Sequence, residues 1–171
     1  MSCALVLEPP VSPADPDSLR RVCATYPTGV AIVSTLDEAS RPCGLTINSF
    51  ISVSLDPPLV LWSLSRKSPN LETFNRAVQG AITILAADQS HLAERFARPH
   101  PDKFADVAVH ADDEAQAPVI DGGVAYLKCS PWSVVEAGDH NVYIWRVDAA
   151  SVLSSAPPLM FHGGALRRGP V

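Results

Sequence analysis

LTINSFISVSL, residues 45–55, alternates apolar and polar side chains more regularly than any other stretch of the chain. Its odd-numbered positions are apolar except Ser49, and its even-numbered positions are polar except Phe50. Successive side chains of a β-strand point to opposite faces, so this two-residue period is typical of a half-buried strand. We therefore predict one continuous strand over 45–55, with the apolar face from Leu45 to Leu55 in the core.

Further apolar runs on both sides of this stretch predict more strands. They are bounded by turn-forming residues, such as Asp56-Pro57-Pro58 and Ala137-Gly138-Asp139. The predicted strands cover residues 30–33, 59–64, 81–85, 124–136, 140–147 and 158–162.

Helices are predicted in three places only. Cap residues indicate helices over about 17–25, opened by Asp17 or Ser18, over 68–78, opened by Ser68 and Pro69, and over 88–96, opened by Asp88. Residues 97–119 are rich in Pro and Asp and lack a period, so we expect a long surface loop of the kind that often acts as a lid. Because strands and helices do not alternate regularly, the predicted fold is mainly β, an antiparallel barrel with peripheral helices.

The composition is that of one globular domain. Of the 171 residues, 47% are hydrophobic and 18% are charged. Residues 1–14 are rich in proline and aperiodic, so we expect an extended N-terminal arm followed by a single domain over 15–171. A formal net charge of -5 disfavours binding to nucleic acid or to an anionic membrane.

The cysteines and histidines indicate neither a disulfide framework nor a metal centre. Cys3, Cys23, Cys43 and Cys129 form no Cys-x-x-Cys pair, and the five histidines are widely spaced. Nothing near the N-terminus resembles an export signal, and no apolar run approaches the roughly 20 residues of a membrane-spanning helix. We expect reduced thiols, a cytoplasmic location and no bound metal.

Familiar nucleotide and hydrolase motifs are absent. The sequence has no Gly-x-Gly-x-x-Gly after a strand, no phosphate-binding loop with Gly-Lys-Ser/Thr, no His-Glu-x-x-His and no Gly-x-Ser-x-Gly. A nucleotide that binds this chain is therefore held by other means.

Short polar side chains on the predicted strand suggest a first half of a binding site. Thr46, Asn48, Ser49 and Ser52 carry hydroxyl and amide groups, where a face meant only for water would more often carry Lys, Glu or Arg. Such groups offer the donors and acceptors that the polar edge of a heterocyclic ring requires. The alternative is a hydroxyl-rich face exposed to solvent.

The second half is the stretch Ser63-x-Ser65-Arg66-Lys67-Ser68-Pro69-Asn70. It places hydroxyls and two cations just before a predicted helix, where free amide groups favour a phosphate. The alternative is that Ser68 only caps the helix while Arg66 and Lys67 lie in solvent. Taken together, the two halves suit a ligand with a polar heterocycle at one end and a phosphate at the other, and flavin mononucleotide is the leading candidate.

Two further residues are candidates for contact with a second ligand. His140 lies at the tip of a predicted hairpin, where it could bind a carboxamide, although a histidine in a turn is more often simply solvated. Phe96, at the end of the predicted 88–96 helix, could offer an aromatic surface for stacking, although it is more often a core residue.

These stretches resemble the flavin reductase family, the small reductase components of two-component flavin-dependent monooxygenases. The resemblance rests on residues 26–30 (YPTGV), 44–50 (GLTINSF) and 52–60 (SVSLDPPLV). It continues through 88–89, 93–97, 103–104, 138–140 and 158–159, and so covers about residues 18–168. The motifs are specific in their combination and order.

The resemblance implies a fold, a reaction and a set of site residues. The fold would be an FMN-binding split β-barrel, usually a homodimer, with FMN or FAD near the subunit interface and NADH or NADPH as co-substrate. The hydride would pass directly between the cofactors, so no catalytic residue of the protein is implied. Thr46, Asn48 and Ser49 would contact the flavin ring and ribityl chain, while Ser63, Ser65, Lys67 and Ser68 would approach the phosphate. The implied cofactor-binding set further includes Thr28, Ile47, Ser52 and Leu64, and His140 with Phe96 would border the nicotinamide.

The chain departs from the family pattern at four positions. Trp145 and Arg146 stand where the family tends to have a small residue and an acid, and Gly163 and Leu166 stand where it often has Arg and Tyr. The expected function is an NAD(P)H-dependent flavin reductase that supplies a partner monooxygenase. The alternatives are a flavin-binding module of the same fold without catalysis, and oxidation of pyridoxamine phosphate on a related barrel.

Overall fold

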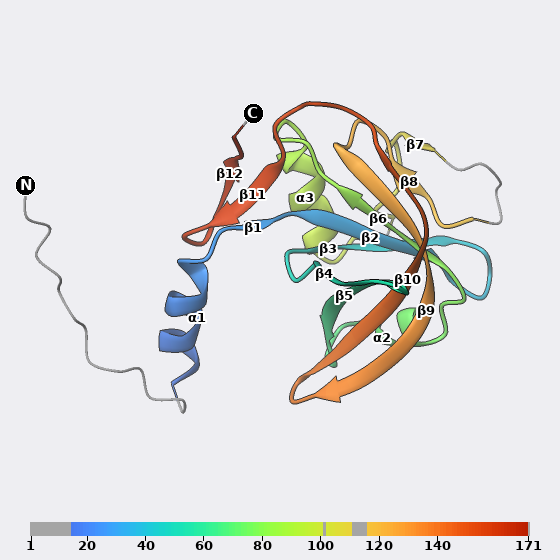
Figure 1. Cartoon of the computed structure of the whole chain (residues 1–171), viewed down its shortest axis with the longest axis horizontal. Coiled ribbons are helices and arrows are strands. Elements are labelled where there is room, and N and C mark those ends of the chain that lie inside the picture. The colour runs from blue at the N-terminus through green and yellow to red at the C-terminus, as the bar shows by residue number, and fades with distance from the viewer. Residues whose placement is uncertain (1–14, 101, 111–115, 171) are drawn as a thin grey trace, which may run out of the picture.

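The computed structural model describes residues 15–100, 102–110 and 116–170. The expected N-terminal arm over 1–14 lies outside these residues. Three helices, α1 (Pro16–Ala24), α2 (Leu71–Asn75) and α3 (Ser90–Ala97), flank a body built of strands (Figure 1). None of the helices in the described ranges has both the length and the apolar character needed to cross a lipid bilayer. The prediction of a mainly β fold with peripheral helices is confirmed.

Twelve strands make up nearly half of the described chain. They are β1 (Thr28–Gly29), β2 (Ala31–Leu36), β3 (Pro42–Ile47), β4 (Ile51–Leu55), β5 (Pro58–Ser65), β6 (Gly80–Ile84), β7 (Val109–His110), β8 (Val119–Ile120), β9 (Ala125–Ala137), β10 (His140–Val152), β11 (Leu159–His162) and β12 (Ala165–Arg168).

Seven of these strands form one antiparallel sheet that curls back on itself. Its order is β3-β2-β6-β9-β10-β5-β4, so the two edge strands, β3 and β4, are consecutive in the chain. Residues 48–50 alone connect them, and a connection of this length spans at most about 14 Å. A flat sheet of seven strands would separate its edges by about 29 Å. The sheet must therefore curl until its edges approach each other, as Figure 1 shows.

A smaller sheet, β1-β11-β12, and the pair β7-β8 lie beside the curled sheet. Strands β11 and β12 are joined by Gly163 and Gly164, which have φ of 61° and 79°. Two consecutive residues with positive φ make the kind of tight turn that matches the twist of a hairpin, and glycine adopts these angles without steric strain. The sequence analysis did not predict β12.

The predicted strand over 45–55 is wrong as a single element, because it is divided into β3 and β4 by residues 48–50. The prediction that its whole apolar face is buried is also wrong. Ile47 is 5% exposed, whereas Ile51, Val53 and Leu55 are 53%, 47% and 92% exposed. The physical reason is that β3 and β4 are at opposite edges of the sheet order. The two-residue period continues in β4, but the apolar side chains of β4 do not face the core that buries Ile47.

The helix predicted over 68–78 is also shorter than expected. Helix α2 comprises five residues, and Ser68 does not cap it, because the Ser68 hydroxyl oxygen accepts from the Asn70 amide at 3.2 Å. Helix α3 begins at Ser90 rather than at Asp88. The loop expected over 97–119 contains β7, and its residues 101 and 111–115 lie outside the described ranges.

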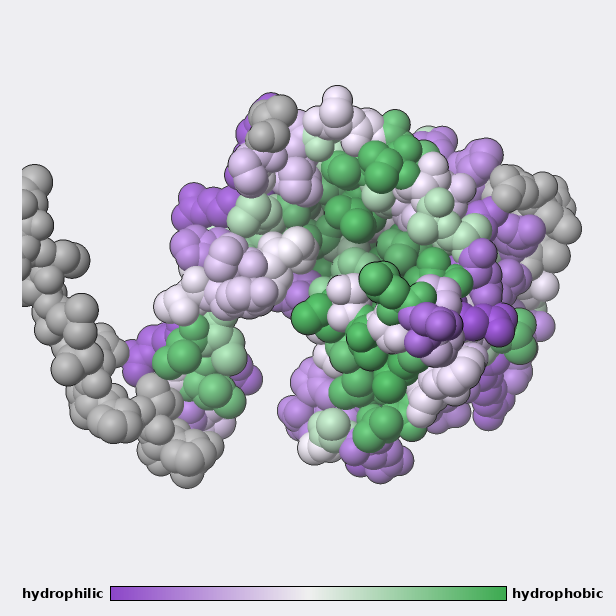
Figure 2. Space-filling model, in the orientation of Figure 1, coloured by the Kyte–Doolittle hydropathy of each residue, from purple (hydrophilic) through white to green (hydrophobic). Residues whose placement is uncertain are grey.

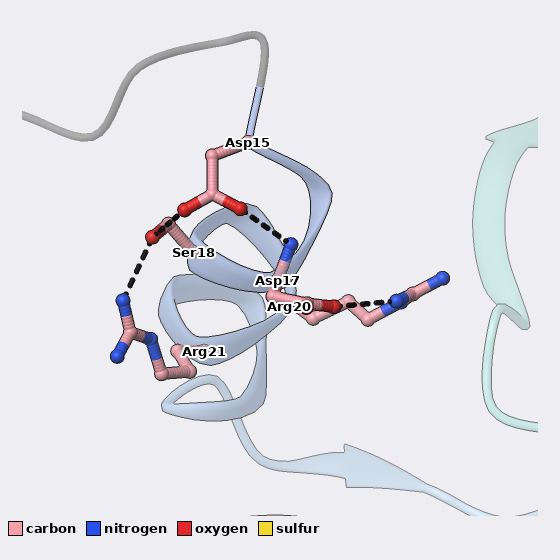
Figure 3. A network of polar contacts seen from close by, with 5 residues as sticks. All are labelled: Asp15, Asp17, Ser18, Arg20 and Arg21. Carbon is pink, nitrogen blue, oxygen red and sulfur yellow. Dashed lines mark hydrogen bonds and ion pairs between the residues drawn. The ribbon is translucent and has the colours of Figure 1, made fainter.

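The first helix is capped two or three residues earlier than predicted, at Asp15 rather than at Asp17 or Ser18 (Figure 3). Asp15 is the N-cap, and its carboxylate accepts from the Asp17 amide at 3.2 Å and from the Ser18 hydroxyl. Arg21 then donates to the Ser18 oxygen at 2.7 Å. The hydrogen bond from Ser18 lowers the pKa of Asp15, so the cap is formed by a carboxylate at neutral pH.

The two larger clusters of buried side chains hold the body together. Inside the curled sheet, Trp62 stacks on Tyr143 with ring centroids 4.4 Å apart, and it meets Phe74 and Trp145 edge-on. The second cluster, which includes Val30, Ile32, Leu85, Phe96 and Leu159, lies where α3 packs against the sheets. The aromatic rings bury large areas, so they contribute much of the hydrophobic stabilisation.

Substitution of Gly80 by Ala tests the packing of this aromatic cluster. A Cβ at position 80 would lie 2.3 Å from two ring atoms of Trp145, so we expect the free energy of unfolding to fall by about 1–3 kcal/mol. Chemical denaturation followed by circular dichroism measures the change. Gly29→Ala is the matched control, because nothing lies within 4 Å of a Cβ there. Equal stability of the two variants would contradict the packing described here.

Candidate functional site

Two neighbouring cavities lie along strand β3. The hairpin cavity, of about 780 Å³, lies between β3, α3 and the β11–β12 hairpin. The loop cavity, of about 590 Å³, lies between β3, the segment before α2 and the segment that follows α3. The two cavities share Thr46, Ala97 and Arg98. The two cavities are therefore adjacent, with Thr46 in the wall of both, and together they make up the candidate site.

The hairpin cavity has an apolar body and a few polar groups. Its apolar lining includes Val30, Ile47, Ala93, Phe161 and Leu166. Its polar lining consists of Thr46, Asn48, Ser90, Glu94 and Arg98. Volume and lining are those of a small-molecule site, in which apolar walls hold the body of a ligand and a few polar groups orient it.

Thr46 and Asn48 have different hydrogen-bonding states in this cavity. The Thr46 hydroxyl donates to the carbonyl of Ala93 at 2.7 Å, which fastens β3 to α3 and leaves the Thr46 oxygen free to accept. Asn48 follows the end of β3, and its exposed amide makes no hydrogen bond to any residue in the described ranges. Asn48 is thus a polar group of this wall that is available to a ligand as both donor and acceptor.

Hydrogen bonds from Lys103 and Arg95 hold the segment after α3 in place. The Lys103 ammonium donates to the carbonyls of Phe96 at 2.7 Å and of Gly44 at 3.3 Å, and burial lowers the pKa of Lys103. Arg95 donates to the carbonyls of Ala105 at 2.6 Å and of Asp102 at 3.1 Å. These bonds hold the part of the segment that carries Arg98 and His100.

The residues predicted between 63 and 68 do not all reach a cavity. The Ser63 amide donates to the Ser49 hydroxyl at 3.0 Å, so these two residues fasten the β3–β4 connection to β5. Leu64 is 5% exposed and lies in the core, and Ser65 accepts from the Lys67 amide at 3.3 Å. Lys67 is exposed. Ser68 is the member of this predicted set that lines the loop cavity.

Ser52 and Thr28 are the remaining polar members of the predicted set. Ser52 is exposed on the edge strand β4. The Thr28 hydroxyl, on β1, is buried and has no hydrogen-bond partner within the described ranges. A buried hydroxyl without a partner is unfavourable by itself, so Thr28 is a position where an additional polar group would stabilise the structure.

His140 begins β10 and lies opposite Ser65 of β5. Its Nδ1 lies 2.7 Å from a carboxylate oxygen of Asp139, and this hydrogen bond lowers the pKa of Asp139. The structure thus brings the 138–140 hairpin tip beside the 63–68 segment, which the sequence alone did not place together. His140 lines neither the hairpin cavity nor the loop cavity.

Phe96 lines the loop cavity, but its side chain is fully buried. Its ring meets Phe104 edge-on, with centroids 4.9 Å apart. Phe96 is therefore a core residue in this structure, and its ring is covered by other parts of the protein.

The four departures from the family pattern fall in different surroundings. Trp145 is fully buried in the aromatic cluster, and Arg146 lies on the surface in an ion pair with Asp148 at 2.9 Å. Gly163 forms the β11–β12 turn, and Leu166 lines the hairpin cavity. Trp145 is thus accommodated by packing rather than placed at a ligand site.

Sequence reasoning did not assign Arg98, His100, Lys103 or the β11–β12 hairpin to the site. Lys103 was noted only as part of a family motif, and the segment around Arg98 was expected to be a surface loop. Their sequence surroundings give little signal, because proline-rich loops without periodicity do not show which cavity they border. Within the described ranges, no three His, Cys, Asp or Glu side chains form a group that could hold a metal ion.

Comparison with known proteins adds independent information. The family model described as "Flavin reductase like domain" matches residues 23–170. FMN reductase (NADH) SmoA of Agrobacterium fabrum is 40% identical over 151 residues, which cover 88% of this chain and 84% of that protein. The reductase component of the flavin-dependent trigonelline monooxygenase of Acinetobacter baylyi is 44% identical over 130 residues, which cover 76% of this chain and 42% of that protein. The chain thus spans less than half the length of some curated relatives that it matches.

Solved structures agree with the fold. The NADH:FAD oxidoreductase of Streptomyces globisporus, solved in complex with NAD and FAD fragments, superposes with a TM-score of 0.88 at 35% identity. The match covers 95% of this chain and 98% of that one. The fold class and the family resemblance expected from the sequence are both confirmed.

Replacement of Lys103 by Met tests whether its two hydrogen bonds fix the cavity wall. We expect faster backbone hydrogen exchange in residues 97–105 and a free energy of unfolding lowered by about 1–3 kcal/mol, because two carbonyls lose a charged donor. Hydrogen exchange followed by mass spectrometry measures the first effect. Lys67→Met, at an exposed lysine, should leave this segment unchanged, and equal exchange in both variants would refute the anchoring role.

Proposed function

Because the chain belongs to the flavin reductase like domain family, we propose that it is an NAD(P)H-dependent flavin reductase that transfers a hydride from a reduced nicotinamide dinucleotide to FMN or FAD. The observation that carries this proposal is the pair of adjacent cavities along β3, the hairpin cavity and the loop cavity, which both have Thr46 in their walls. A flavin has the matching shape, with a flat ring at one end and a phosphate at the other.

The residues present in the hairpin cavity fit a flavin ring. Val30, Ile47 and Leu166 offer apolar walls to the body of the ring, and Asn48 offers an unused amide to its polar edge. The cavity volume of about 780 Å³ lies within the range of small-molecule sites. The buried hydroxyl of Thr28 is a further polar group without a partner in the described ranges.

The protein's part in the reaction is to bind and orient the two cofactors. When bound, the flavin supplies the hydride-accepting chemistry, so the chain needs no nucleophile of its own. Asn48 and Thr46 orient the ring, and the apolar lining excludes water from it. His140 would border the nicotinamide from outside both cavities, and Phe96 supports the wall of the loop cavity from the core.

A flavin-binding module without catalysis is the second candidate, and the position of His140 favours it. This side chain is 44% exposed, is paired with Asp139 and lines neither cavity. A module would use the cavities along β3 and leave the hairpin tip without a role.

The reductase proposal predicts flavin-dependent oxidation of NADH or NADPH by the purified protein. The decrease in the absorbance of NADH or NADPH over time gives the oxidation rate after FMN, FAD or riboflavin is added. Absence of a flavin-dependent rate with every combination would reject the enzyme in favour of the module.

Substitution of His140 by Ala separates the two candidates further. If His140 borders the nicotinamide, the variant should show a KM for NADH raised by about three- to tenfold, with the Kd for flavin unchanged, because one hydrogen bond to the second ligand is lost. Steady-state kinetics and flavin titration measure the two constants. Unchanged kinetics would remove His140 from the site.

We also propose a homodimer, located in the cytoplasm, that supplies reduced flavin to a partner monooxygenase. The names of the relatives support the last part, since one is a reductase component of a monooxygenase. The outward face of the sheet supports the dimer. Ile51 on β4 pairs with Leu61 on β5, and Leu61 pairs with Ile144 on β10. Two residues away on the same face of β10, Val142 pairs with Val135 of β9, so these five side chains make up one outward apolar row.

This outward row is apolar where a solvated sheet face is usually polar. Ile51 and Val135 are 53% and 49% exposed. Helix α1 projects from the body and exposes Leu19 and Val22 on one side, and Figure 2 shows hydrophobic surface both on α1 and on the body (Figures 1 and 2). A second copy of the chain would cover these surfaces.

The dimer predicts a mass of twice 18.2 kDa in light scattering after size-exclusion chromatography. Ile51→Glu should shift the mass toward the monomer, because it places a charge in the apolar row. Val78→Glu is the control, since Val78 is 82% exposed and lies outside this row. A wild-type mass of one chain would reject the dimer.

A further inference from the structure

The arginines that have no partner within the described ranges lie at the hairpin cavity or beside it. Seven of the ten arginines of the chain are engaged by carboxylate, carbonyl or hydroxyl oxygens. The side chains of the other three, Arg98, Arg167 and Arg168, are exposed and make no ion pair or hydrogen bond to any described residue. Arg98 lines the hairpin cavity, and the other two belong to β12, whose Leu166 also lines it.

Strand β12 places Arg168 on the cavity side of the β11–β12 hairpin. In the antiparallel register of this hairpin, Leu166 lies opposite Phe161, and both line the cavity. Side chains two residues apart on a strand share a face, so Arg168 follows Leu166 on the cavity side. Arg167 is on the other face of the same strand. Because β12 is the outer strand of its sheet (Figure 1), both guanidinium groups lie at the edge of the site.

The surroundings of the hairpin cavity are positive in a chain of negative net charge. The lining of the cavity contains one carboxylate, Glu94, and one arginine, Arg98. Arg167 and Arg168 add two positive charges beside it, whereas the whole chain carries a formal net charge of -5. A local excess of one sign of charge at a cleft raises the local concentration of ligands of the opposite sign. An anionic ligand is thus attracted to this end of the molecule.

The positions of Arg167 and Arg168 favour attraction at a distance rather than a fixed contact. Both lie on an edge strand, and no described residue holds either guanidinium group in one position. An exposed charge still acts over about the Debye length, which is roughly 10 Å at 0.1 M salt. Charges at the rim of a binding site act mainly on the rate of association, and they need no contact in the final complex to do so.

We propose that Arg167 and Arg168 steer the anionic nicotinamide dinucleotide toward the hairpin cavity and so raise the rate at which the protein binds it. This proposal rests on the proposed function, since it assumes that a flavin in this cavity accepts the hydride. The phosphates of the dinucleotide carry the negative charge on which the field acts, while its nicotinamide ring carries the hydride. The two arginines therefore act on the encounter between co-substrate and protein, and they leave the hydride transfer itself unchanged.

Steady-state oxidation of NADH by the full chain, with FMN at a saturating concentration, tests the proposal. At low salt, the double variant Arg167→Gln/Arg168→Gln should lower kcat/KM for NADH by about three- to tenfold, while kcat changes by less than about twofold. At about 0.5 M salt the loss in kcat/KM should shrink to less than about twofold, because salt screens exposed charges. A loss that persists at high salt would overturn steering, since it would indicate direct contact with the bound dinucleotide.

A hydride donor without phosphates separates steering from damage to the site. Reduced N-benzylnicotinamide has the dihydronicotinamide ring but no negative charge, so the wild type and the double variant should oxidise it equally fast. Equal losses with NADH and with this neutral donor would overturn the proposal, because they would show that the substitutions alter the cavity itself.

The double variant Arg20→Gln/Arg76→Gln is the matched control. It also removes two exposed arginines, and neither of them lines the hairpin cavity or the loop cavity. The control therefore has the same net charge as the test variant, and it should leave kcat/KM for NADH unchanged within about twofold. An equal loss in the control would overturn the proposal, since the net charge of the chain would then matter rather than the position of the charges.

The same measurements distinguish failure of this proposal from failure of the proposed function. Wild-type protein that oxidises NADH with a kcat/KM independent of salt would refute steering and leave the reductase intact. Wild-type protein that oxidises neither NADH nor NADPH with any of the flavins would refute the reductase itself.

Discussion

The structure depends on the three residues that connect the two edges of the seven-stranded sheet. Residues 48–50 join β3 to β4, and a link this short forces the sheet to curl. The hydrogen bond from the Ser63 amide to the Ser49 hydroxyl fastens the link to β5. The same link carries Asn48, so the constraint that closes the fold also places an unused amide at the wall of the hairpin cavity.

The curl creates two interiors with different tasks. The aromatic cluster around Trp62 fills the inside of the sheet, and its close approach to the backbone at Gly80 leaves room for no side chain there. The second cluster packs α3 against β2 and β11, and the hydrogen bond from Thr46 to the Ala93 carbonyl joins α3 to β3. The candidate site lies along this second contact, where the two elements leave space on either side of Thr46.

The polar groups of the site divide into those that hold the protein together and those that remain available. The side chains of Lys103, Arg95, Ser49 and Ser65 are engaged with the backbone, whereas those of Asn48 and Arg98 have no partner in the described ranges. Residue type alone does not reveal this division, because a serine or a lysine can serve either purpose. The availability of a group, rather than its chemical type, therefore identifies the groups that a ligand can use.

The sequence by itself determined the class of fold, the long β9–β10 hairpin and the family, because alternation and turn-forming residues act locally and the family motifs are specific in combination. It also identified Thr46, Asn48 and Ser68, which line the cavities. Only the tertiary structure decided that residues 45–55 form two strands on opposite edges, that Leu64 is buried in the core, and that Arg98 and His100 line the loop cavity. The physical reason is that these outcomes depend on which distant segment packs against each residue. A two-residue period or the composition of a loop is a local property and does not identify that segment.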